Sequence, residues 1–267
     1  MQTDVEFCWC VEKACWSAWP VATQREIDGW LCRSSGGTTR RANSVNATPR
    51  AGAVRDVIPG ADAYFEKRGG SPALFRLLSF QPAFAHALSA RGYRPEGATH
   101  TLLADLVEVE AQTSSASRPS VGLVSGPVSG SVSGLQLEPA PSPAWLADKQ
   151  ELSSQSEAEA EIFRAMLADI THPACFARKV ADNRGRSLAY GVYVAPFLVI
   201  EAVVTREEDR NKGFAGELVA ALMAWGRAEG AQHACLQVMA ENEPAIALYR
   251  RLGFGVTLYD YQYWRKP

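Results

Sequence analysis

The sequence predicts an α+β (α/β) fold in which helices flank a mixed central sheet and the chain is organised in two halves. Residues 197–205 are nearly all apolar and rich in valine and isoleucine, which indicates a strand buried on both faces. A polar turn with two glycines follows, and then an amphipathic helix over residues 216–229. Strands and helices also alternate before a long segment rich in serine, glycine and proline, so we expect two units of similar kind.

The elements of the first half are predicted from apolar spacing and from the positions of proline and glycine. They are a helix over residues 5–19, strands over 26–33 and 38–45, a helix over 56–68, a strand over 73–80, a helix over 82–90 and a strand over 98–109. Pro59 and Gly60 are expected to disturb the helix over 56–68, because proline removes an amide donor.

The second half begins after residues 112–143, which we predict to be a linker or long loop with no packed element beyond short extended pieces. The elements expected after it are helices over 144–150 and 156–170, strands over 174–182, 187–194 and 197–205, the helix over 216–229, a strand over 234–239, a helix from about 243 to 252 and a strand over 256–265. Ser154 or Ser156 is expected to cap the helix over 156–170.

The turn after residues 197–205 has the features of an anion-binding loop. Arg210, Gly213 and Ala215 form the pattern R-x-x-G-x-A at the start of a helix. Unpaired amides and the helix dipole favour anions at such a place, and glycines let a diphosphate approach the backbone. Taken alone, the pattern also fits an ordinary strand-to-helix turn.

A second motif lies at residues 241–254, with the sequence ENEPAIALYRRLGF. Asn242 is suited to cap a helix that has Pro244 in its first turn and Gly253 at its end. Together, in this order and at this distance, the two motifs resemble those of the GNAT superfamily of N-acetyltransferases. They lie in about the last third of the chain, and the predicted element order of the second half is the order of a GNAT domain.

The resemblance implies direct transfer of an acetyl group from acetyl-CoA to a primary amine, with no covalent enzyme intermediate. It implies that strand residues hold the pantetheine arm through their backbone and that the loop holds the pyrophosphate. The residues concerned are Val203, Val204 and Thr205 for the arm, and Arg210, Asn211, Lys212, Gly213, Phe214, Ala215 and Gly216 for the pyrophosphate. Asn242 matches an asparagine near the arm, although helix capping explains it equally well.

Two residues are the candidates for proton transfer. Tyr249 matches the tyrosine that many GNAT enzymes use as general acid toward the CoA sulfur; otherwise it is a tyrosine that packs on the sheet. Glu201 is the ionisable side chain within the strand over 197–205, where a carboxylate is costly unless it is paired or lines a cavity. It is either the base, acting directly or through water, or the structural partner of an arginine. His172 and His233 are further candidates for the base.

The first half resembles a degenerate copy of the last third. At an offset of 161 positions, Gly52, Gly69 and Gly92 align with Gly213, Gly230 and Gly253. Pro49, Val54 and Leu88 then stand where Arg210, Ala215 and Tyr249 stand, so the copy lacks the chemistry. We therefore predict two tandem GNAT-like domains: a degenerate one over residues 1–110, a linker over 111–143 and a catalytic one over 144–267. An unrelated α+β domain is the alternative for the first half.

Composition limits the remaining possibilities. With 47% hydrophobic and 21% charged residues the chain is globular, and its net charge of −2 gives no basic surface for nucleic acid. No apolar run reaches membrane-spanning length and the N-terminus is unlike a secretory signal, so we expect a cytoplasmic protein without a membrane partner. The six cysteines are expected to be reduced thiols, and their spacing predicts no metal site.

Two questions stay open at this level. A patch of polar residues in the first half either faces the cleft, where it would bind an acidic substrate or the 3′-phosphate of the cofactor, or forms a solvated strand edge; its members are Arg33, Arg40, Arg41, Asn43 and Asn46. The alternative to an enzyme is a CoA-binding or regulatory module without turnover. The sequence identifies neither the acceptor amine nor the oligomeric state.

Overall fold

The computed structural model describes residues 4–69, 72–107 and 134–267, whose strands form one mixed sheet. The elements of the first half are α1 (Val5–Ala18), β1 (Thr23–Ile27), β2 (Trp30–Ser34), the 3₁₀ helix η1 (Arg40–Ala42), β3 (Asn43–Ala47), α2 (Val54–Glu66), β4 (Phe75–Leu78), α3 (Pro82–Ser89) and β5 (Arg94–Asp105). Those of the second half are β6 (Leu135–Glu138), α5 (Pro143–Leu152), α6 (Glu157–Ala168), β7 (Ala174–Ala181), β8 (Arg184–Val194), β9 (Phe197–Thr205), η2 (Glu207–Asp209), α7 (Phe214–Ala228), β10 (His233–Met239), α8 (Glu243–Arg251) and β11 (Val256–Arg265).

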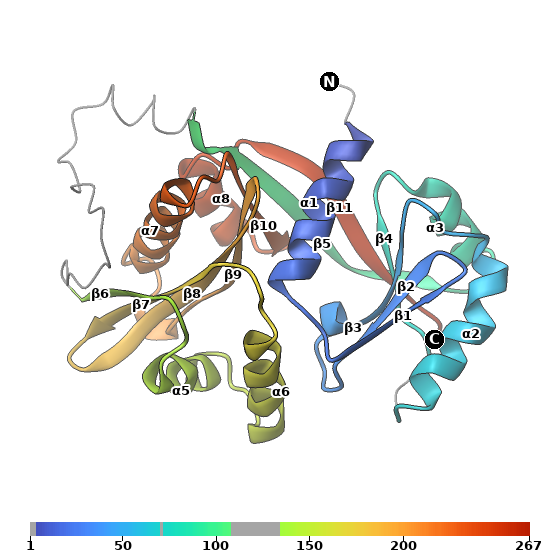
Figure 1. The fold of residues 1–267 in the computed structure, drawn as a ribbon, viewed down its shortest axis with the longest axis horizontal. Helices are drawn as coiled ribbons and strands as arrows, with labels where there is room; N and C mark the ends of the chain where they lie inside the picture. Colours follow the sequence, from blue (N-terminus) through green and yellow to red (C-terminus); the bar gives the residue numbers. More distant parts are fainter. Residues whose placement is uncertain (1–3, 70–71, 108–133) are drawn as a thin grey trace.

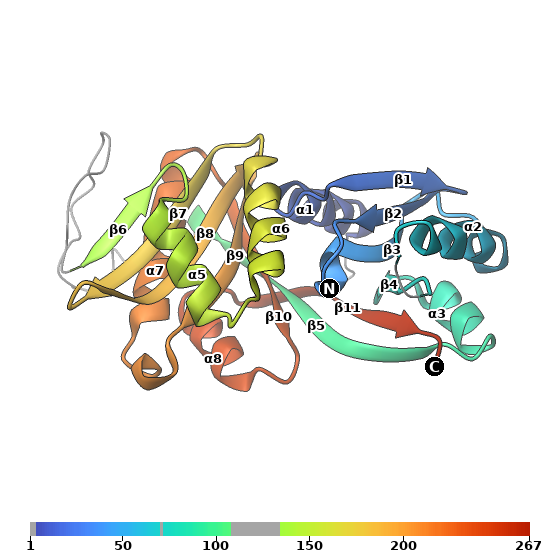
Figure 2. The same cartoon turned by 90° about the horizontal axis from the view of Figure 1, so that it is seen from below.

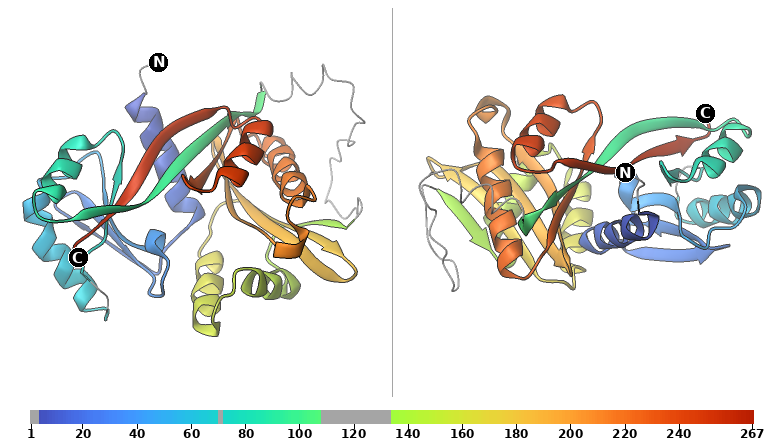
Figure 3. Two further views of the ribbon diagram at one scale, coloured as in Figure 1. Left: turned by 180° about the vertical axis from the view of Figure 1, so that it is seen from behind. Right: turned by 90° about the horizontal axis from the view of Figure 1, so that it is seen from above.

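The strand order is β1-β2-β3-β4-β11-β5-β10-β9-β8-β7-β6, so the last strand of each half pairs with the other half. β5 lies antiparallel to β10, with Leu103 opposite Cys235, and β11 lies antiparallel to β4, with Tyr261 opposite Leu78. β5 and β11 also pair with each other. Figures 1 and 3 show these two long strands running side by side from one half to the other. The sheet is therefore continuous across the predicted boundaries at residues 110 and 143.

The two halves repeat the same element order. β1, β2 and β3 are antiparallel and β3 pairs in parallel with β4, just as β7, β8 and β9 are antiparallel and β9 pairs in parallel with β10. α2 and α3 follow β3 and β4 as α7 and α8 follow β9 and β10. The offset of 161 positions places α2, β4, α3 and β5 on α7, β10, α8 and β11, so the glycine alignment marks a structural repeat.

Helices cover both faces of the sheet in the second half. Leu218 and Leu222 of α7 pack with Leu198 and Leu236 of the sheet on one face. α1, α5 and α6 pack on the opposite face, where Trp145 and Phe163 join Tyr190 in the core. α2 and α3 share one core with the strands of the first half, as α7 does in the second half. α6 lies near the C-terminal end of α1, where the Trp19 ring is 5.7 Å from the Phe163 ring, and Figure 2 shows both helices between the two halves.

Two predictions about the elements were wrong. Residues 26–33 form a hairpin rather than one strand, because Asp28 and Gly29 adopt positive φ of 45° and 75° and turn the chain between Ile27 and Trp30. Residues 38–45 were expected to be one strand but contain η1 before β3 begins. The helix predicted around Pro59 is α2, which contains this proline.

The predicted linker over residues 111–143 contains one ordered strand. β6 pairs with β7, and Leu135 and Leu137 pack against the core, so a short apolar stretch becomes a strand through its tertiary partner. Residues 108–133 lie outside the described part of the chain. α5 and α6 form as expected, and Ser156 is the cap of α6 through a reciprocal capping box with Glu159. No helix among the described residues is both long and apolar enough to cross a membrane.

Candidate active site

The candidate site begins where β9 and β10 separate. The two strands pair in parallel only over residues 197–200 and 233–236. Beyond them, β9 stays on β8 and β10 stays on β5, and the β8–β9 register shifts by one residue between Glu201 and Val204. Ala202 takes a φ of 55° at this shift, a left-handed conformation that is uncommon for a residue with a side chain. The resulting divergence leaves residues 201–205 without a β10 partner in the described structure.

Val203, Val204 and Thr205 lie on this diverging segment and are partly buried. Ser187 on β8 donates its hydroxyl to the Val204 carbonyl at 2.8 Å and lies 2.8 Å from the Thr205 hydroxyl. The side of β9 that faces β8 is thus occupied. The side that faces β10 has no strand partner over residues 201–205 of the described chain, so its backbone is of the kind with which an extended ligand pairs as an added strand does.

The loop from Arg210 to Gly213 is exposed and leads into α7. Asn211 and Gly213 adopt positive φ of 64° and 86°, and Gly213 occupies the cap position of α7 without a side-chain hydrogen bond. A Cβ on Gly213 would meet no atom within 4 Å, so the space ahead of the first helical amides is open. Such amides, together with the helix dipole, form an anion site.

The two cations of this loop have different surroundings. Lys212 donates to Asp209 at 2.7 Å, and Asp209 also pairs with Arg186 at 3.1 Å. Arg210 has no ion-pair partner among the described residues and is exposed. Lys212 is therefore tied to the loop structure, whereas Arg210 is free to meet a ligand. Phe214, Ala215 and Gly216 form the first turn of α7, which begins two residues earlier than predicted, so Phe214 and Ala215 are helical rather than part of the loop.

α8 presents Tyr249 to the same region. Asn242 caps this helix by accepting a hydrogen bond from the Ala245 amide at 3.3 Å, so the capping role expected of it is confirmed. Tyr249 is buried and packs edge-on against Phe254, and its hydroxyl has no hydrogen-bond partner within the described structure. Burial, with a smaller contribution from the Glu201 charge, raises the pKa of Tyr249 to about 12.

Glu201 is paired with an arginine from the other half of the chain. Its Oε1 accepts a hydrogen bond from Arg41 Nη1 at 2.5 Å, and the Glu201 side chain is only 5% exposed. Arg41 also lies over the Trp19 ring, 5.1 Å from the centroid. Burial opposes the charge of Arg41, but Glu201 holds the pKa of Arg41 above its ordinary range. Glu201 is thus the partner of an arginine, which was one of the two roles that the sequence allowed for it. Its second carboxylate oxygen, Oε2, has no hydrogen-bond partner among the described atoms.

The polar patch of the first half is not a solvated strand edge. Arg33 is 2% exposed and donates to the carbonyls of Trp16 and Trp19, at 3.2 and 2.6 Å, and Asn46 is also buried. Asn43 binds the loop over residues 34–39, and Arg40 pairs with Glu96. The sequence could not show this for the three arginines, because their partners come from the end of α1, from β5 and from β9.

The histidines lie elsewhere. His233 is at the start of β10, opposite Phe197, and therefore at the other end of the strands from the divergence. Its ring stacks on Phe197, with centroids 5.9 Å apart, and meets Phe7 edge-on. His172 lies in the loop before β7 and lines a different cavity, next to Pro173. Neither histidine is brought to Glu201 or Tyr249.

The counterpart of the anion loop in the first half is closed. Gly52, which aligns with Gly213, donates its amide to the Asp28 carbonyl at 2.8 Å and accepts from the Trp30 indole at 3.0 Å. A Cβ on Gly52 would lie 3.2 Å from the Asp28 oxygen. The turn between β1 and β2 thus covers the approach to α2, in contrast to the open approach to α7.

The fold and the site together define a GNAT-type acetyltransferase, and comparisons with known proteins agree. Residues 9–263 match the family described as probable histone acetyltransferase Rv0428c, C-terminal. The chain belongs to this family and is an N-acetyltransferase. It is 24% identical over 248 residues to the uncharacterized N-acetyltransferase YobR of Bacillus subtilis (strain 168), covering 92% of this chain and 93% of that protein.

Two solved structures share the fold. The GCN5-related N-acetyltransferase from Kribbella flavida superposes with a TM-score of 0.65 at 12% identity, over 100% of this chain and 97% of the other. A tandem GNAT protein from the clavulanic acid biosynthesis pathway gives a TM-score of 0.61 at 15% identity, over 83% and 74% of the two chains. At these identities the likeness concerns the fold, and it confirms the predicted GNAT-like architecture.

Proposed function

We propose that the protein transfers an acetyl group directly from acetyl-CoA to a primary amine. The observation that supports this proposal is the divergence of β9 from β10 after residue 200, just before the chain leads into α7. Glu201 lies on the diverging strand and its charge contributes to the raised pKa of Tyr249. An extended thioester can pair with the open side of β9 while its diphosphate meets the α7 amides. The carbonyl carbon would then lie between the two groups that exchange protons with the reactants.

The cofactor residues follow from this placement. Residues 203–205 would bind the pantetheine arm through their backbone, and the loop from Arg210 to Gly216 would bind the pyrophosphate, with Arg210 as the cation free to contact it. Asn242 contributes through the position of α8, because its side-chain oxygen is used as the helix cap. Acetyl-CoA supplies the activated acetyl group when it is bound.

Tyr249 and Glu201 would carry out the proton transfers. With a pKa of about 12, Tyr249 holds its proton at neutral pH and can donate it to the departing thiolate. Glu201 Oε2 would accept the proton of the amine, directly or through water, while Arg41 fixes the carboxylate through Oε1. Arg41 is thus a positioning residue, and it comes from the half of the chain that lacks an open anion loop.

We further propose that the first half, residues 1–110, is a degenerate GNAT-like domain without an acetyl-CoA site, and that residues 144–267 form the catalytic domain after a connection over 111–143. The closed approach to α2 supports this division, since the β1–β2 turn occupies the space where a diphosphate would lie. The first half would act on catalysis through Arg41 and through β5, which completes the sheet beside β10.

Calorimetric titration of the full chain with acetyl-CoA tests the proposal. We expect one site per chain, abolished by Gly213→Glu because the new side chain brings bulk and negative charge to the diphosphate position. Gly92→Glu is a matched control: its φ of 82° is close to the 86° of Gly213, and a Cβ would meet no atom within 4 Å at either position. Both variants therefore carry the same backbone strain, and only the first should lose binding.

Two other outcomes would contradict parts of the proposal. Two sites per chain would show that the first half also binds the cofactor. No binding to the wild-type chain would remove acetyl-CoA as the donor. Where binding is found, mass spectrometry of a panel of primary amines incubated with the protein and acetyl-CoA should detect N-acetyl products and no stable acetyl-enzyme.

A further inference from the structure

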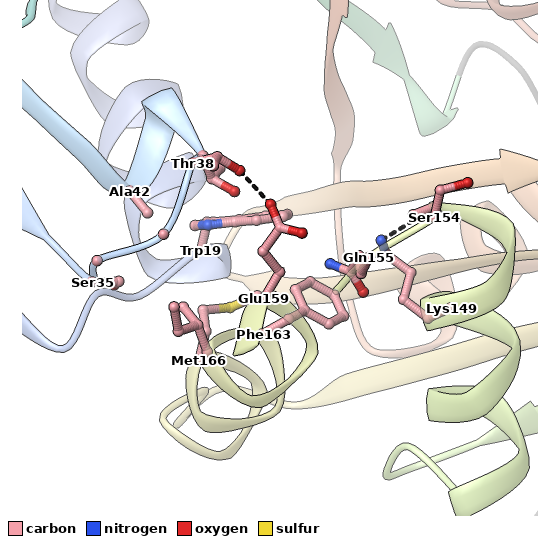
Figure 4. Close-up of a pocket in the computed structure, with 15 residues that line it drawn as sticks. Trp19, Ser35, Thr38, Ala42, Lys149, Ser154, Gln155, Glu159, Phe163 and Met166 are labelled. Carbon is pink, nitrogen blue, oxygen red and sulfur yellow. Dashed lines mark hydrogen bonds between the residues drawn. The ribbon is translucent and has the colours of Figure 1, made fainter. Parts of the chain in front are cut away.

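A cavity lies between the two halves, beside the candidate active site. Its volume is about 290 Å³, and it is enclosed by the loop over residues 35–39 and Trp19 on one side and by α5 and α6 on the other. Figure 4 shows Trp19, Glu159, Phe163 and Lys149 around it, with Thr38 bridging to Glu159. Neither half alone forms this cavity.

Lys149 is the unusual residue of its wall. It is 7% exposed, its ammonium donates to Ser153 Oγ at 2.7 Å and lies 4.7 Å from the centre of the Phe163 ring, and no carboxylate pairs with it among the described residues. The second buried lysine, Lys179, pairs with Glu217. Burying a charge without an opposite charge is costly, and burial lowers the pKa of Lys149 to about 8.

The one carboxylate of the cavity does not compensate Lys149. Glu159 accepts from Thr38 Oγ1 at 2.6 Å, from the Ser156 amide at 3.0 Å and from Ser156 Oγ at 2.8 Å, so its charge is used to cap α6 and to hold the loop. Gln155 lines the same cavity with a buried Oε1 that has no partner in the described structure. Because an amide can present either its oxygen or its nitrogen, Gln155 is able to donate beside Lys149.

Trp19 and Arg41 connect the cavity to Glu201. Trp19 lines the cavity, and its ring is tilted against the Phe163 ring with centroids 5.7 Å apart. The Arg41 guanidinium lies over the same Trp19 ring, 5.1 Å from its centroid. Ala42, next to Arg41 in η1, lines the cavity as well, and Arg41 holds Glu201. Contacts through Trp19 and Arg41 therefore lead from the cavity to the carboxylate proposed to accept the amine proton.

From these contacts we propose that the cavity binds a carboxylate of the acceptor, so that the substrate is an amine that also bears a carboxylate. Lys149 supplies the opposite charge and Gln155 a hydrogen bond, while Trp19 and Phe163 enclose the carbon chain between the carboxylate and the amine. This inference rests on the proposed amine acetylation. It explains why a buried ammonium is left without a carboxylate partner in the described structure, since the ligand would bring that partner.

Matched acceptors test the inference. A series of ω-amino acids, from glycine to 6-aminohexanoate, is compared with the corresponding carboxamides by measuring kcat and KM with acetyl-CoA in excess. The wild-type protein should prefer at least one acid over its amide by tenfold or more in kcat/KM. Lys149→Met should raise KM for that acid by about tenfold to 100-fold, with the amide unchanged. Lys149→Arg should retain part of the preference, and Lys13→Met, which removes an exposed charge from α1, should retain all of it.

We expect Lys149→Met to fold. Burial disfavours the Lys149 ammonium at pH 7, so the variant should have a melting temperature equal to or above that of the wild-type protein. The difference between the two melting temperatures should shrink as pH rises from about 8 toward 10.5, because Lys149 then loses its charge in the folded wild-type protein. Equal use of acids and amides by the wild-type protein would overturn the inference, as would a Lys149→Met variant that loses both substrates equally.

Direct binding separates this inference from the proposed function. If acetyl-CoA binds but no amine of the series is acetylated, calorimetric titration with glutarate tests the carboxylate site by itself. Saturable glutarate binding that is lost in Lys149→Met would support the carboxylate site and would contradict the proposed reaction. Absence of glutarate binding to the wild-type protein in that case would overturn the site itself.

Discussion

Tyr249 illustrates how burial prepares a single residue for a role. Its hydroxyl lies in an apolar setting near the Glu201 charge, and both features favour the protonated phenol. The pKa of about 12 keeps the donor form fully populated across the neutral range. The hydroxyl makes no hydrogen bond within the described structure and is not among its fully buried polar atoms, so it is free to meet a ligand.

At this scale we predict that Tyr249→Phe lowers kcat by about 100-fold and leaves the Kd for acetyl-CoA unchanged, because general acid catalysis typically contributes 10²–10⁴-fold. Steady-state kinetics and calorimetry check both values. Tyr93→Phe, another buried tyrosine, is the control and should keep full turnover. Since Tyr249 ionises only near pH 12, any alkaline loss of activity below pH 10 must come from another group. Unchanged kcat in Tyr249→Phe would remove the acid role.

α1 is the element that fixes the position of the two halves on each other. Its Glu12 is fully buried and pairs through both carboxylate oxygens with Arg76 of β4, while Tyr259 of β11 donates to Glu12 at 2.7 Å. Arg76 also lies over the Tyr261 ring at 3.7 Å. Such a network is costly to bury but costs more to break, because one partner is then left as an uncompensated charge.

We predict that Glu12→Gln lowers the free energy of unfolding by about 3 kcal/mol at pH 7. Burial opposes ionisation of Glu12, but Arg76 and Tyr259 hold its pKa below the ordinary 4.5. The stabilisation is therefore fully present above pH 4.5 and is lost as pH falls through the lowered pKa. Urea denaturation at pH 7 and at low pH measures both effects.

Glu26→Gln serves as the control for that measurement. Glu26 pairs with Arg50 at 3.1 Å, but both side chains are at least half exposed, so its removal should cost less than about 1 kcal/mol. Equal losses in the two variants would show that the Glu12 network does not anchor α1.

The whole molecule is built as one sheet from two similar halves that exchange their last strands. β5 of the first half lies between β10 and β11 of the second half, and β11 lies between β4 and β5 of the first half. Each half therefore supplies a strand that fills a gap between two strands of the other half. Arg41, the loop over residues 35–39 and α1 add side chains of the first half to the site of the second. The candidate site is therefore built from both halves, although the loop proposed to bind the cofactor belongs to the second half alone.

For the intact chain we predict a single cooperative thermal transition by scanning calorimetry. Leu88→Ala in α3 and Leu222→Ala in α7, both fully buried, should each lower the midpoint of the same transition, at a cost of about 2–5 kcal/mol. Acetyl-CoA should raise that midpoint in both variants. A thermogram of Leu88→Ala that splits into two transitions would show instead that the halves unfold independently.

Local patterns were sufficient for most elements of the second half. β9 was predicted with the bounds that the structure shows, because the apolar run begins after Pro196 and ends at a polar turn, which admits few alternatives. The cap of α8 and the open loop before α7 follow from residues close in sequence. The β1–β2 hairpin was missed although Asp28-Gly29 is a common turn pair, and β6 had no local signal strong enough to distinguish it from the surrounding loop.

The sequence by itself determined the family resemblance, the cofactor loop, the repeat at an offset of 161 positions and the candidates Tyr249 and Glu201. Only the tertiary structure decided that β5 and β11 exchange halves, that Arg41 holds Glu201 and that Lys149 is buried without a carboxylate partner in the described chain. The physical reason is the sequence distance between partners. Capping, turns and periodicity depend on neighbours in the chain, whereas the strand pairs β5–β10 and β4–β11 and the Arg41–Glu201 ion pair join residues more than a hundred positions apart.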